Sequence, residues 1–535
     1  MTQDTAVAGG PVRHGARDAL GVFAPVAIGL SAGLTVLIGL LGPSAMAPGL
    51  PGPSWHPPYS LNAGPGGHLV IALAAAAIAL GGTGLAAALR SRWRPDPRLL
   101  LWAGSAVAAL LALLPPSGSA DHLNYAAYGR LAALGRDPYA VAPAAFPGDP
   151  VAGAVEEWAG VTSVYGPVAT AVQALASLAG GDSVRLTVFG MALFNAAAFV
   201  GTGLLLHRLT AADADLQRRA ALLWTANPLM IYHLSAGMHV DTMAVACMAA
   251  ALFAFSSLRG AAGGATSGVL LGLGIGVKLN AGLVALGPAW ELRRRPGRLV
   301  LVAGTATATV AAVYGIAGPH VLDQVGAASR KVSLGTPWQP VKLALQSLFG
   351  PGAYAVWIQA GSVLLLAALA WLVFRAVPGG PIGPGGAVPA GGRLLPPTPP
   401  VPPSPSTSTP PVPPSTSAPV RRPVPPEAPA PLVAAVIVVA WLFAAPYALP
   451  WYDGLAFALL AAAPAWPALE GFVVARTAIL SLGYLPAREA LRPDDLLWLK
   501  TVVRQQVVPW SLLALTAALL WWAARAGARA RRRPA

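Results

Sequence analysis

Residues 99–130 read LLLWAGSAVAALLALLPPSGSADHLNYAAYGR, an apolar run that ends a few residues before the carboxylate of Asp121. Such a run is typical of a membrane helix, so the acid lies at the end of that helix rather than in an ordinary solvated loop. Placing a carboxylate there costs free energy, and a function would explain the cost. The polar and aromatic stretch from Ser117 to Val161 is therefore the first candidate for a site of chemistry.

Composition indicates a membrane protein along nearly the whole chain. Of the 535 residues, 55% are hydrophobic and only 10% are charged, whereas a soluble domain carries about 25% charged residues. Apolar runs of roughly 20 residues recur, which no water-soluble core needs. The sequence therefore predicts an all-α fold, a polytopic transmembrane helical bundle with about a dozen spans and short re-entrant helices.

Several function classes are excluded by the same composition. Cys247, the single cysteine, lies in an apolar run, so neither a disulfide framework nor a thiolate metal site can form. The net charge of +15 comes from Lys and Arg in short loops beside the apolar runs, which is a topology signal and not a nucleic-acid signal. With no HExxH pattern and no nucleotide-binding glycine motif, we expect no metal, no cofactor and no nucleic acid.

The arginines predict how the chain crosses the membrane. With residue 1 taken as cytoplasmic, Arg90 to Arg98 lie inside and the loop 115–163 lies outside. The run 20–41 is too long for a signal-peptide core of about 7–15 residues, although Ala45-Met46-Ala47 resembles a cleavage site. Full spans are expected near residues 20–41, 68–89, 99–114, 186–206, 219–237, 241–257, 299–317, 353–375, 432–450, 454–468, 470–486 and 507–525.

Two further apolar runs fit the charge bias only if they do not cross the membrane completely. A full crossing by residues 164–179 would place Arg208, Arg218 and Arg219 outside, so we expect a re-entrant or surface helix there. The run 265–290 is interrupted by GVKLN and followed by ELRRRPGR. We expect a hairpin of two short helices, with Lys278 at its tip inside the protein.

The chain also contains a segment that cannot form a core. Residues 378–431 are mostly Pro, Gly, Ser and Thr with few bulky apolar residues, which predicts an extended, mostly disordered linker on the cytoplasmic face. A passive spacer and a ligand for an SH3-type domain are both open interpretations. The expected organisation is a cytoplasmic tail (1–19), a transmembrane core (20–377), the linker (378–431), C-terminal helices (432–525) and a basic cytoplasmic tail (526–535).

The outer loop supplies the first group of candidate residues. Asp121, Tyr125 and Tyr128 share one face of a predicted helix, where the carboxylate can accept a proton from an acceptor hydroxyl. The alternative is that Asp121 caps a surface helix. Glu156 and Glu157 precede Trp158, which is typical of carbohydrate contact and equally of an exposed loop. The other candidates for substrate contact in this region are His122, Arg130, Tyr139 in GRDPY and Tyr165 in VYGP.

A second group of candidates follows later in the chain. His239 and Asp241, in NPLMIYHLSAGMHVDT (227–242), are expected on the same side as Asp121, as ligand contacts or as a hydrogen-bonded helix terminus. Lys278 lies in an apolar run and needs a partner, for which a lipid phosphate suits its compact charge. The remaining candidates are Arg330 and Lys331 in SRKVSLGTPWQP and Tyr452 in ALPWYDG, where Trp451 is interpreted as an interface anchor.

These motifs occur in an order that resembles one family. They are DxxxYxxxGR at 121–130, GRDPY, VYGP at 164–167, NPL with GMHVD at 227–241, the Lys-bearing hairpin and the late PWY. The chain resembles the actinobacterial polyprenol-phosphate-mannose-dependent α-1,6-mannosyltransferases of the MptB kind, which have the GT-C fold. The resemblance covers most of the chain except the termini and the Pro-rich segment. Val240 departs from the family pattern, because an amide residue is expected between His239 and Asp241.

The resemblance implies a multi-pass plasma-membrane enzyme whose active site faces outside. The implied donor is polyprenyl-phosphate-mannose, the implied acceptor is a lipid-anchored mannan, and Asp121 is the implied base. Membrane lipids are the other expected partners. Two rival interpretations are a transporter or lipid flippase, in which Lys278 and Asp121 form a coupling pair, and a non-catalytic scaffold. The flippase interpretation does not explain the aromatic-rich outer loop.

Overall fold

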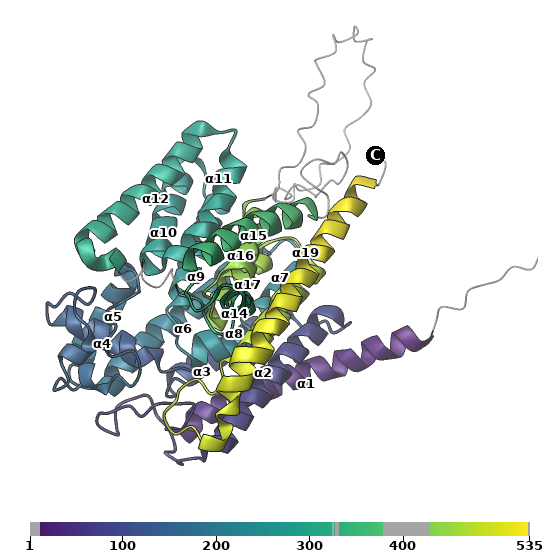
Figure 1. Ribbon diagram of the computed structural model, residues 1–535. Coiled ribbons are helices and arrows are strands. Elements are labelled where there is room, and N and C mark those ends of the chain that lie inside the picture. Colours follow the sequence, from purple (N-terminus) through teal and green to yellow (C-terminus); the bar gives the residue numbers. More distant parts are fainter. Residues whose placement is uncertain (1–10, 324–325, 327–330, 378–428, 533–535) are drawn as a thin grey trace, which may run out of the picture.

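The computed structural model describes residues 11–323, 326, 331–377 and 429–532, and these form a bundle of helices (Figure 1). The described residues contain no β-strand. The α-helices are α1 (Pro11–Leu41), α2 (Gly67–Arg90), α3 (Pro97–Ala112), α4 (Asp121–Ala133), α5 (Pro167–Gly180), α6 (Val184–Leu209), α7 (Ala214–Leu223), α8 (Pro228–Met230), α9 (Asp241–Ser257), α10 (Gly260–Val277), α11 (Leu286–Leu292), α12 (Pro296–Ala317), α14 (Trp338–Phe349), α15 (Ala355–Arg375), α16 (Ala430–Ala444), α17 (Asp453–Ala462), α18 (Pro467–Gly483) and α19 (Val508–Arg532). Short 3₁₀ or π elements are η1 (Pro143–Ala145), η2 (Ala152–Ala154), η3 (Ile231–Ala236), η4 (Leu279–Ala285), η5 (Pro319–Leu322), η6 (Pro450–Tyr452), η7 (Asp494–Leu496) and η8 (Leu499–Val507).

The predicted all-α, polytopic membrane bundle is confirmed. Within the described ranges, seven helical segments are long and apolar enough to cross a membrane: α1 from Ala19, α2, α6, α10, α12, α15 and the segment Asp494–Arg529 that contains α19. Four shorter apolar helices, α3, α5, α9 and α16, accompany them. Seven is fewer than the dozen spans expected from the apolar runs, because several runs fold into helices shorter than a full crossing.

The run 219–237 is one place where the expected span is broken. Helix α7 ends at Leu223, and the helix restarts as α8 at Pro228, directly after Asn227. The Asn227 side chain accepts hydrogen bonds from the backbone N–H groups of Leu229 and Met230, and Pro228 has no N–H to continue the preceding helix. The expectation of one continuous helix there was wrong, because an Asn-Pro start signal lies inside the apolar run.

The chain reverses direction between α10 and α12. Glycines 264, 268, 272 and 276 of α10 lie against residues 301, 305, 309 and 313 of α12, a constant separation of 37 residues. Small residues at every fourth position let two helix backbones approach closely. Because the constant separation means that the two helices run parallel, residues 278–295 must return along the bundle. Lys278 therefore lies at the tip of a hairpin, whose first arm is a full-length helix rather than the expected short one.

Helix α5 begins and ends at the same end of the bundle. The backbone N–H of Gly166 donates to the carbonyl of Val277, beside the Lys278 tip, and Gly180 packs against Thr187 in the first turns of α6. Its 14 residues are therefore accommodated without a crossing, as the charge bias predicts.

Arginines of several described segments lie at the opposite end of the bundle from Asp121. Arg219 pairs with Glu470 near the start of α18, and Arg298 lies over the Phe255 ring near the end of α9. Helix α9 begins at the other end with Asp241. We name these regions the arginine end (residues 90–98, 208–219 and 293–298) and the Asp121 end (the starts of α4 and α9, and Lys278). In Figure 1 helices α4 and α5 lie at the lower left, far from the C-terminus.

Some of the sequence predictions fall on residues outside the described ranges. These are Arg330, residues 378–428, which make up nearly all of the Pro-rich segment, and residues 1–10 and 533–535 of the two predicted tails.

Candidate active site

Asp121 is the first residue of α4, and its side chain does not cap the helix. The N-cap position is Ala120, and the backbone N–H of Asp121 donates to Ser119 Oγ at 3.1 Å. The alternative in which Asp121 caps a surface helix is therefore wrong. The carboxylate keeps 21% exposure, so a ligand can still reach it.

His239 is a close ionisable neighbour of Asp121. Its Nδ1 lies 3.6 Å from Asp121 Oδ2 and 3.2 Å from the hydroxyl of Tyr125, one helical turn further along α4. The imidazole stacks on the indole of Trp451, with ring centroids 3.6 Å apart and planes 13° from parallel. Trp451 is only 2% exposed, so its interpretation as an interface anchor was wrong. The stack fixes the imidazole plane that faces Asp121.

The backbone before His239 is unusual in two respects. Residues 231–236 form a π-helix, η3, and Met238 has a φ of +52°, in the left-handed region that a non-glycine residue seldom adopts. Asn195 from α6 donates to the carbonyl of Leu234 at 2.6 Å and so holds this segment. Such departures from regular helix occur often at functional sites, because the surrounding structure has to stabilise them. Here they place His239 beside Asp121.

Lys278 and Asp241 form a buried ion pair next to this group. Lys278 lies where α10 ends, in extended backbone, and its ammonium is 2.7 Å from both carboxylate oxygens of Asp241. The same ammonium lies 4.0 Å from the centre of the Tyr452 ring, within range of a cation–π interaction. The protein partner of Lys278 was not predicted, because Asp241 reaches it only through the folding of the hairpin.

Electrostatics mark Asp121 as a group that titrates near neutral pH. Burial raises the pKa of Asp121 from 3.8 to about 6, the charge of Lys278 lowers it in part, and the carboxylates of Glu157 and Asp241 raise it. Burial disfavours the charged form of a carboxyl group, and a nearby cation favours it. A base is most effective when its pKa lies near the working pH, and the environment of Asp121 shifts its pKa in that direction.

Aromatic rings lie around Asp121 and the Lys278–Asp241 pair. Tyr165 packs edge-on against Tyr125 with centroids 4.9 Å apart, and Tyr128 lies 6.3 Å from Tyr165. Tyr484 packs edge-on against Trp451 at 5.1 Å. The candidate Tyr165 therefore lies at the site, and Tyr484 is a site residue that sequence reasoning missed. An apolar run flanks Tyr484, and no local pattern distinguished it from an interface aromatic.

Several other predicted residues have structural partners away from Asp121. Arg130 pairs with Asp149 and Asp182, which fastens α4 to the loops around it, and Tyr139 shares a hydrogen bond with Thr170 of α5. Glu156 pairs with Arg488. The hydroxyl of Tyr128 donates to the carbonyl of Val161.

Three candidates remain to be placed. His122 is fully buried, and neither ring nitrogen has a hydrogen-bond partner within the described part of the chain. Lys331 is exposed and lies 6.0 Å from the centre of the Trp158 ring. Arg330 is not among the described residues, so it stays a prediction.

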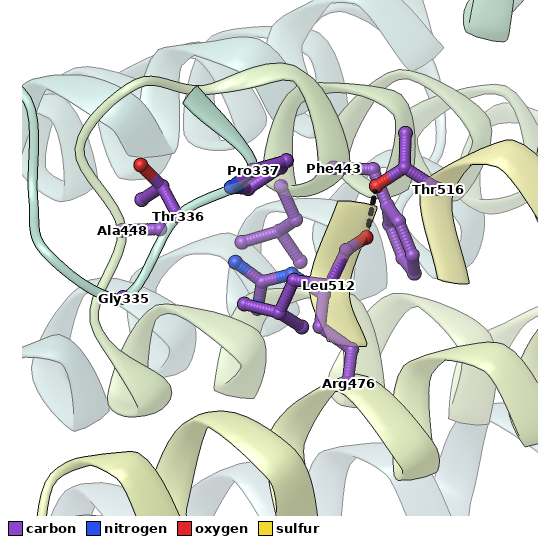
Figure 2. A pocket seen from close by; sticks show the side chains of 9 residues that line it. Gly335, Thr336, Pro337, Phe443, Ala448, Arg476, Leu512 and Thr516 are labelled. Atoms are coloured by element: carbon purple, nitrogen blue, oxygen red, sulfur yellow. Dashed lines mark hydrogen bonds between the residues drawn. The ribbon is translucent and has the colours of Figure 1, made fainter. Parts of the chain in front are cut away.

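Two other observations concern possible metal sites and cavities. Across the described ranges, no group of three or more His, Cys, Asp or Glu side chains is placed to hold a metal ion. Figure 2 shows a small hollow between α16, α18 and α19, into which Arg476 projects. Its lining residues are Gly335, Thr336, Pro337, Leu442, Phe443, Ala448, Arg476, Leu512 and Thr516. This hollow is separate from the Asp121 group, and Arg476 there pairs with the buried Asp453.

Comparison with known proteins supports the interpretation of this region. The family model described as alpha-(1->6)-mannopyranosyltransferase, N-terminal domain, matches residues 26–294, which is just over half of the chain. That range contains Asp121, His239, Asp241 and Lys278. No solved structure matches the chain.

Two curated relatives match as well. The chain is 30% identical over 224 residues to alpha-(1->6)-mannopyranosyltransferase A of Mycobacterium tuberculosis, a match that covers 41% of this chain and 42% of the relative. It is 26% identical over 175 residues to the protein of the same name from Corynebacterium glutamicum, covering 33% and 35%. The matches thus span less than half the length of either relative. Together with the family model, they show that the chain belongs to the MptA/B family of α-(1→6)-mannopyranosyltransferases.

Proposed function

We propose that the protein is a membrane glycosyltransferase of GT-C type that transfers a mannosyl residue from polyprenyl-phosphate-mannose to a mannan or lipoglycan acceptor. The observation that carries the proposal is the position of Asp121, whose raised pKa, His239 neighbour and proximity to Lys278 bring a base and a cation together at one site. Family membership supports mannose as the sugar and α-1,6 as the linkage.

Asp121 acts as the base in this proposal. The acceptor oxygen forms a bond to the anomeric carbon of mannose, the bond from that carbon to the phosphate oxygen breaks, and Asp121 takes the hydroxyl proton. His239 and Tyr125 keep the carboxylate oriented toward the acceptor. From a β-linked donor, this single displacement gives an α-linked product with inversion.

Lys278 stabilises the leaving group. When the bond to the anomeric carbon breaks, its electron pair goes to the phosphate, and an ammonium placed beforehand meets the developing charge. Asp241 holds the ammonium of Lys278 at the site, through contacts of 2.7 Å to both of its carboxylate oxygens. The ring of Tyr452 supports the same cation from another side.

The proposed active site faces the outside of the plasma membrane. Short loops rich in Lys and Arg tend to stay on the cytoplasmic side, and here they gather at the arginine end, opposite the Asp121 end. A lipid-linked donor and a lipid-anchored acceptor would then meet at the outer surface.

The proposal is tested by purifying the full chain into lipid vesicles and supplying polyprenyl-phosphate-mannose with an α-1,6-linked mannose oligosaccharide. The expected result is a product longer by one hexose, with release of polyprenyl phosphate. Absence of transfer by a folded, correctly inserted protein, under conditions in which a relative transfers mannose, would refute the donor assignment.

A further inference from the structure

Trp158 has a backbone conformation that non-glycine residues seldom adopt. Its φ is +64°, in the left-handed region that is costly for a bulky non-glycine residue. Its side chain is nevertheless 63% exposed, so the burial of the indole does not compensate for the strain. A residue that costs stability and buries little is a candidate for function rather than packing.

The loop around Trp158 is fixed on both sides. Before Trp158, Glu156 pairs with Arg488, and the Glu157 carboxylate accepts a hydrogen bond from the backbone N–H of Glu489 at 3.1 Å. After it, the N–H of Val161 donates to the carbonyl of Trp158 at 2.9 Å. The indole is therefore exposed on a rigid support, which limits the entropy lost when a ligand binds.

This loop lies beside the Asp121 site. Asn124, one turn after Asp121 on α4, donates to the carbonyl of Glu157 at 2.9 Å. The Glu157 carboxylate is near enough to raise the pKa of Asp121. A chain bound at Asp121 can therefore extend over the neighbouring Trp158.

We propose that Trp158 is the stacking platform of an acceptor subsite, which binds a hexose ring of the acceptor glycan next to the residue that receives the mannose. A pyranose ring presents patches of C–H groups, and these are attracted to the negative face of an aromatic ring. This inference rests on the proposed function and adds an acceptor contact to it.

The charges around Trp158 favour a sugar over the hydrocarbon of a bilayer. Glu156 and Glu157 precede it directly, and the ammonium of Lys331 lies 6.0 Å from its ring. Moving these groups toward hydrocarbon is costly, whereas hydrated charged groups beside an exposed ring suit a hydroxyl-rich ligand. We therefore assign the ring to the glycan.

Three variants test the subsite in the vesicle assay with a water-soluble α-1,6-linked mannose oligosaccharide as acceptor. Trp158→Gly removes the ring and relieves the backbone strain, since glycine adopts positive φ freely. Trp158→Phe keeps an aromatic plate. Trp55→Ala is the matched control, because Trp55 is also an exposed loop tryptophan (73%) and has no positive φ.

Trp158→Gly should raise the acceptor KM about tenfold and leave the donor KM and kcat within about twofold. Its melting temperature should equal or exceed that of the unaltered protein, because strain is removed. Trp158→Phe should recover most of the acceptor affinity, and Trp55→Ala should match the unaltered protein.

Two results would overturn the subsite. One is an unchanged acceptor KM in Trp158→Gly while the protein transfers mannose normally. The other is a rise in KM that appears only with a lipid-anchored acceptor, which would place Trp158 in the bilayer. Failure of the unaltered protein to transfer mannose at all would instead count against the proposed function.

Discussion

Two buried ion pairs at opposite ends of the bundle differ in what surrounds them. At the arginine end, Arg219 contacts Glu470 at 2.6 Å and donates to the carbonyl of Ala463, while Glu470 accepts from the backbone N–H of Trp466. At the Asp121 end, Lys278 contacts the side chains of Asp241 and Tyr452. The first pair is bound into the backbone of neighbouring helices, and the second is bordered by Asp121 and by aromatic rings.

The difference indicates that the Arg219–Glu470 pair is structural and that the Lys278–Asp241 pair belongs to the candidate active site. A guanidinium presents several N–H donors in one rigid plane, which suits fixed backbone and carboxylate partners. An ammonium is a compact charge that can turn toward a ligand. Side-chain exposure agrees, at 9% and 3% for Arg219 and Glu470 against 15% and 7% for Lys278 and Asp241. We infer that the first pair holds α7 to α18 and that the second meets the donor phosphate.

The largest effect is expected from Asp121→Asn. Transfer should fall by about 10²–10⁴ because the base is lost, while donor binding persists. The melting temperature at neutral pH should be unchanged or higher: a carboxyl group whose pKa is raised in the folded state stabilises it at low pH and loses that contribution as pH rises through about 6. Near-normal transfer by the folded variant would move the base to another carboxylate of this region, such as Glu157 or Asp241.

Lys278→Met should lower transfer by about 10²–10³, because the charge of the leaving group is unmatched. The same change leaves Asp241 buried without its partner, so the variant will also lose stability. The Lys278→Met, Asp241→Asn double variant separates the two effects. Thermal unfolding should recover in the double variant and transfer should stay low. Recovery of both would make Lys278 a purely structural residue.

Arg219→Met should have the reverse profile. The free energy of unfolding should fall by about 3–5 kcal/mol, because an unpaired carboxylate remains buried, and adding Glu470→Gln should restore part of it. The kcat of the protein that remains folded should stay within about twofold of the unaltered value. A loss of kcat as large as that of Lys278→Met, measured on folded protein, would remove the distinction between the two pairs.

The smallest perturbation tests whether the two ends face opposite sides of the membrane. Gly148 and Gly297 are exposed, and a side chain added at either meets no neighbour within 4 Å. In a Cys247→Ser background, Gly148→Cys should react with an impermeant thiol reagent from outside, and Gly297→Cys only after permeabilisation. Both variants should keep full activity. Labelling of Gly297→Cys from outside in intact cells would contradict the proposed topology.

Sequence patterns predicted much of the bundle because the membrane imposes lengths and charge positions. The expected spans at 68–89, 186–206 and 299–317 nearly match α2, α6 and α12, and the positions of the arginines predicted the reversal at Lys278. The residues of the site were predicted less well. Asp121, Lys278 and His239 stood out as polar groups in apolar surroundings, but their partners did not.

Three partners escaped prediction for the same physical reason. The Asp241 contact to Lys278, the Trp451 stack on His239 and the Tyr484 contact to Trp451 all join distant segments. Local spacing carries no information about such contacts. Conversely, Arg130 and Tyr139 have the residue types of a binding site, yet they are used to hold α4 and α5 in place.

The most direct test of the central claim, that Asp121 is the base, is the pH dependence of kcat/KM, since this profile reports ionisations of the free enzyme. With a pKa of about 6 for Asp121, the rate should be constant above neutral pH and fall about tenfold per pH unit below about 6. The same acid limb should persist in His239→Gln, which lacks the imidazole beside Asp121. A flat profile down to about pH 5, or an acid limb that disappears in His239→Gln, would contradict the assignment of Asp121.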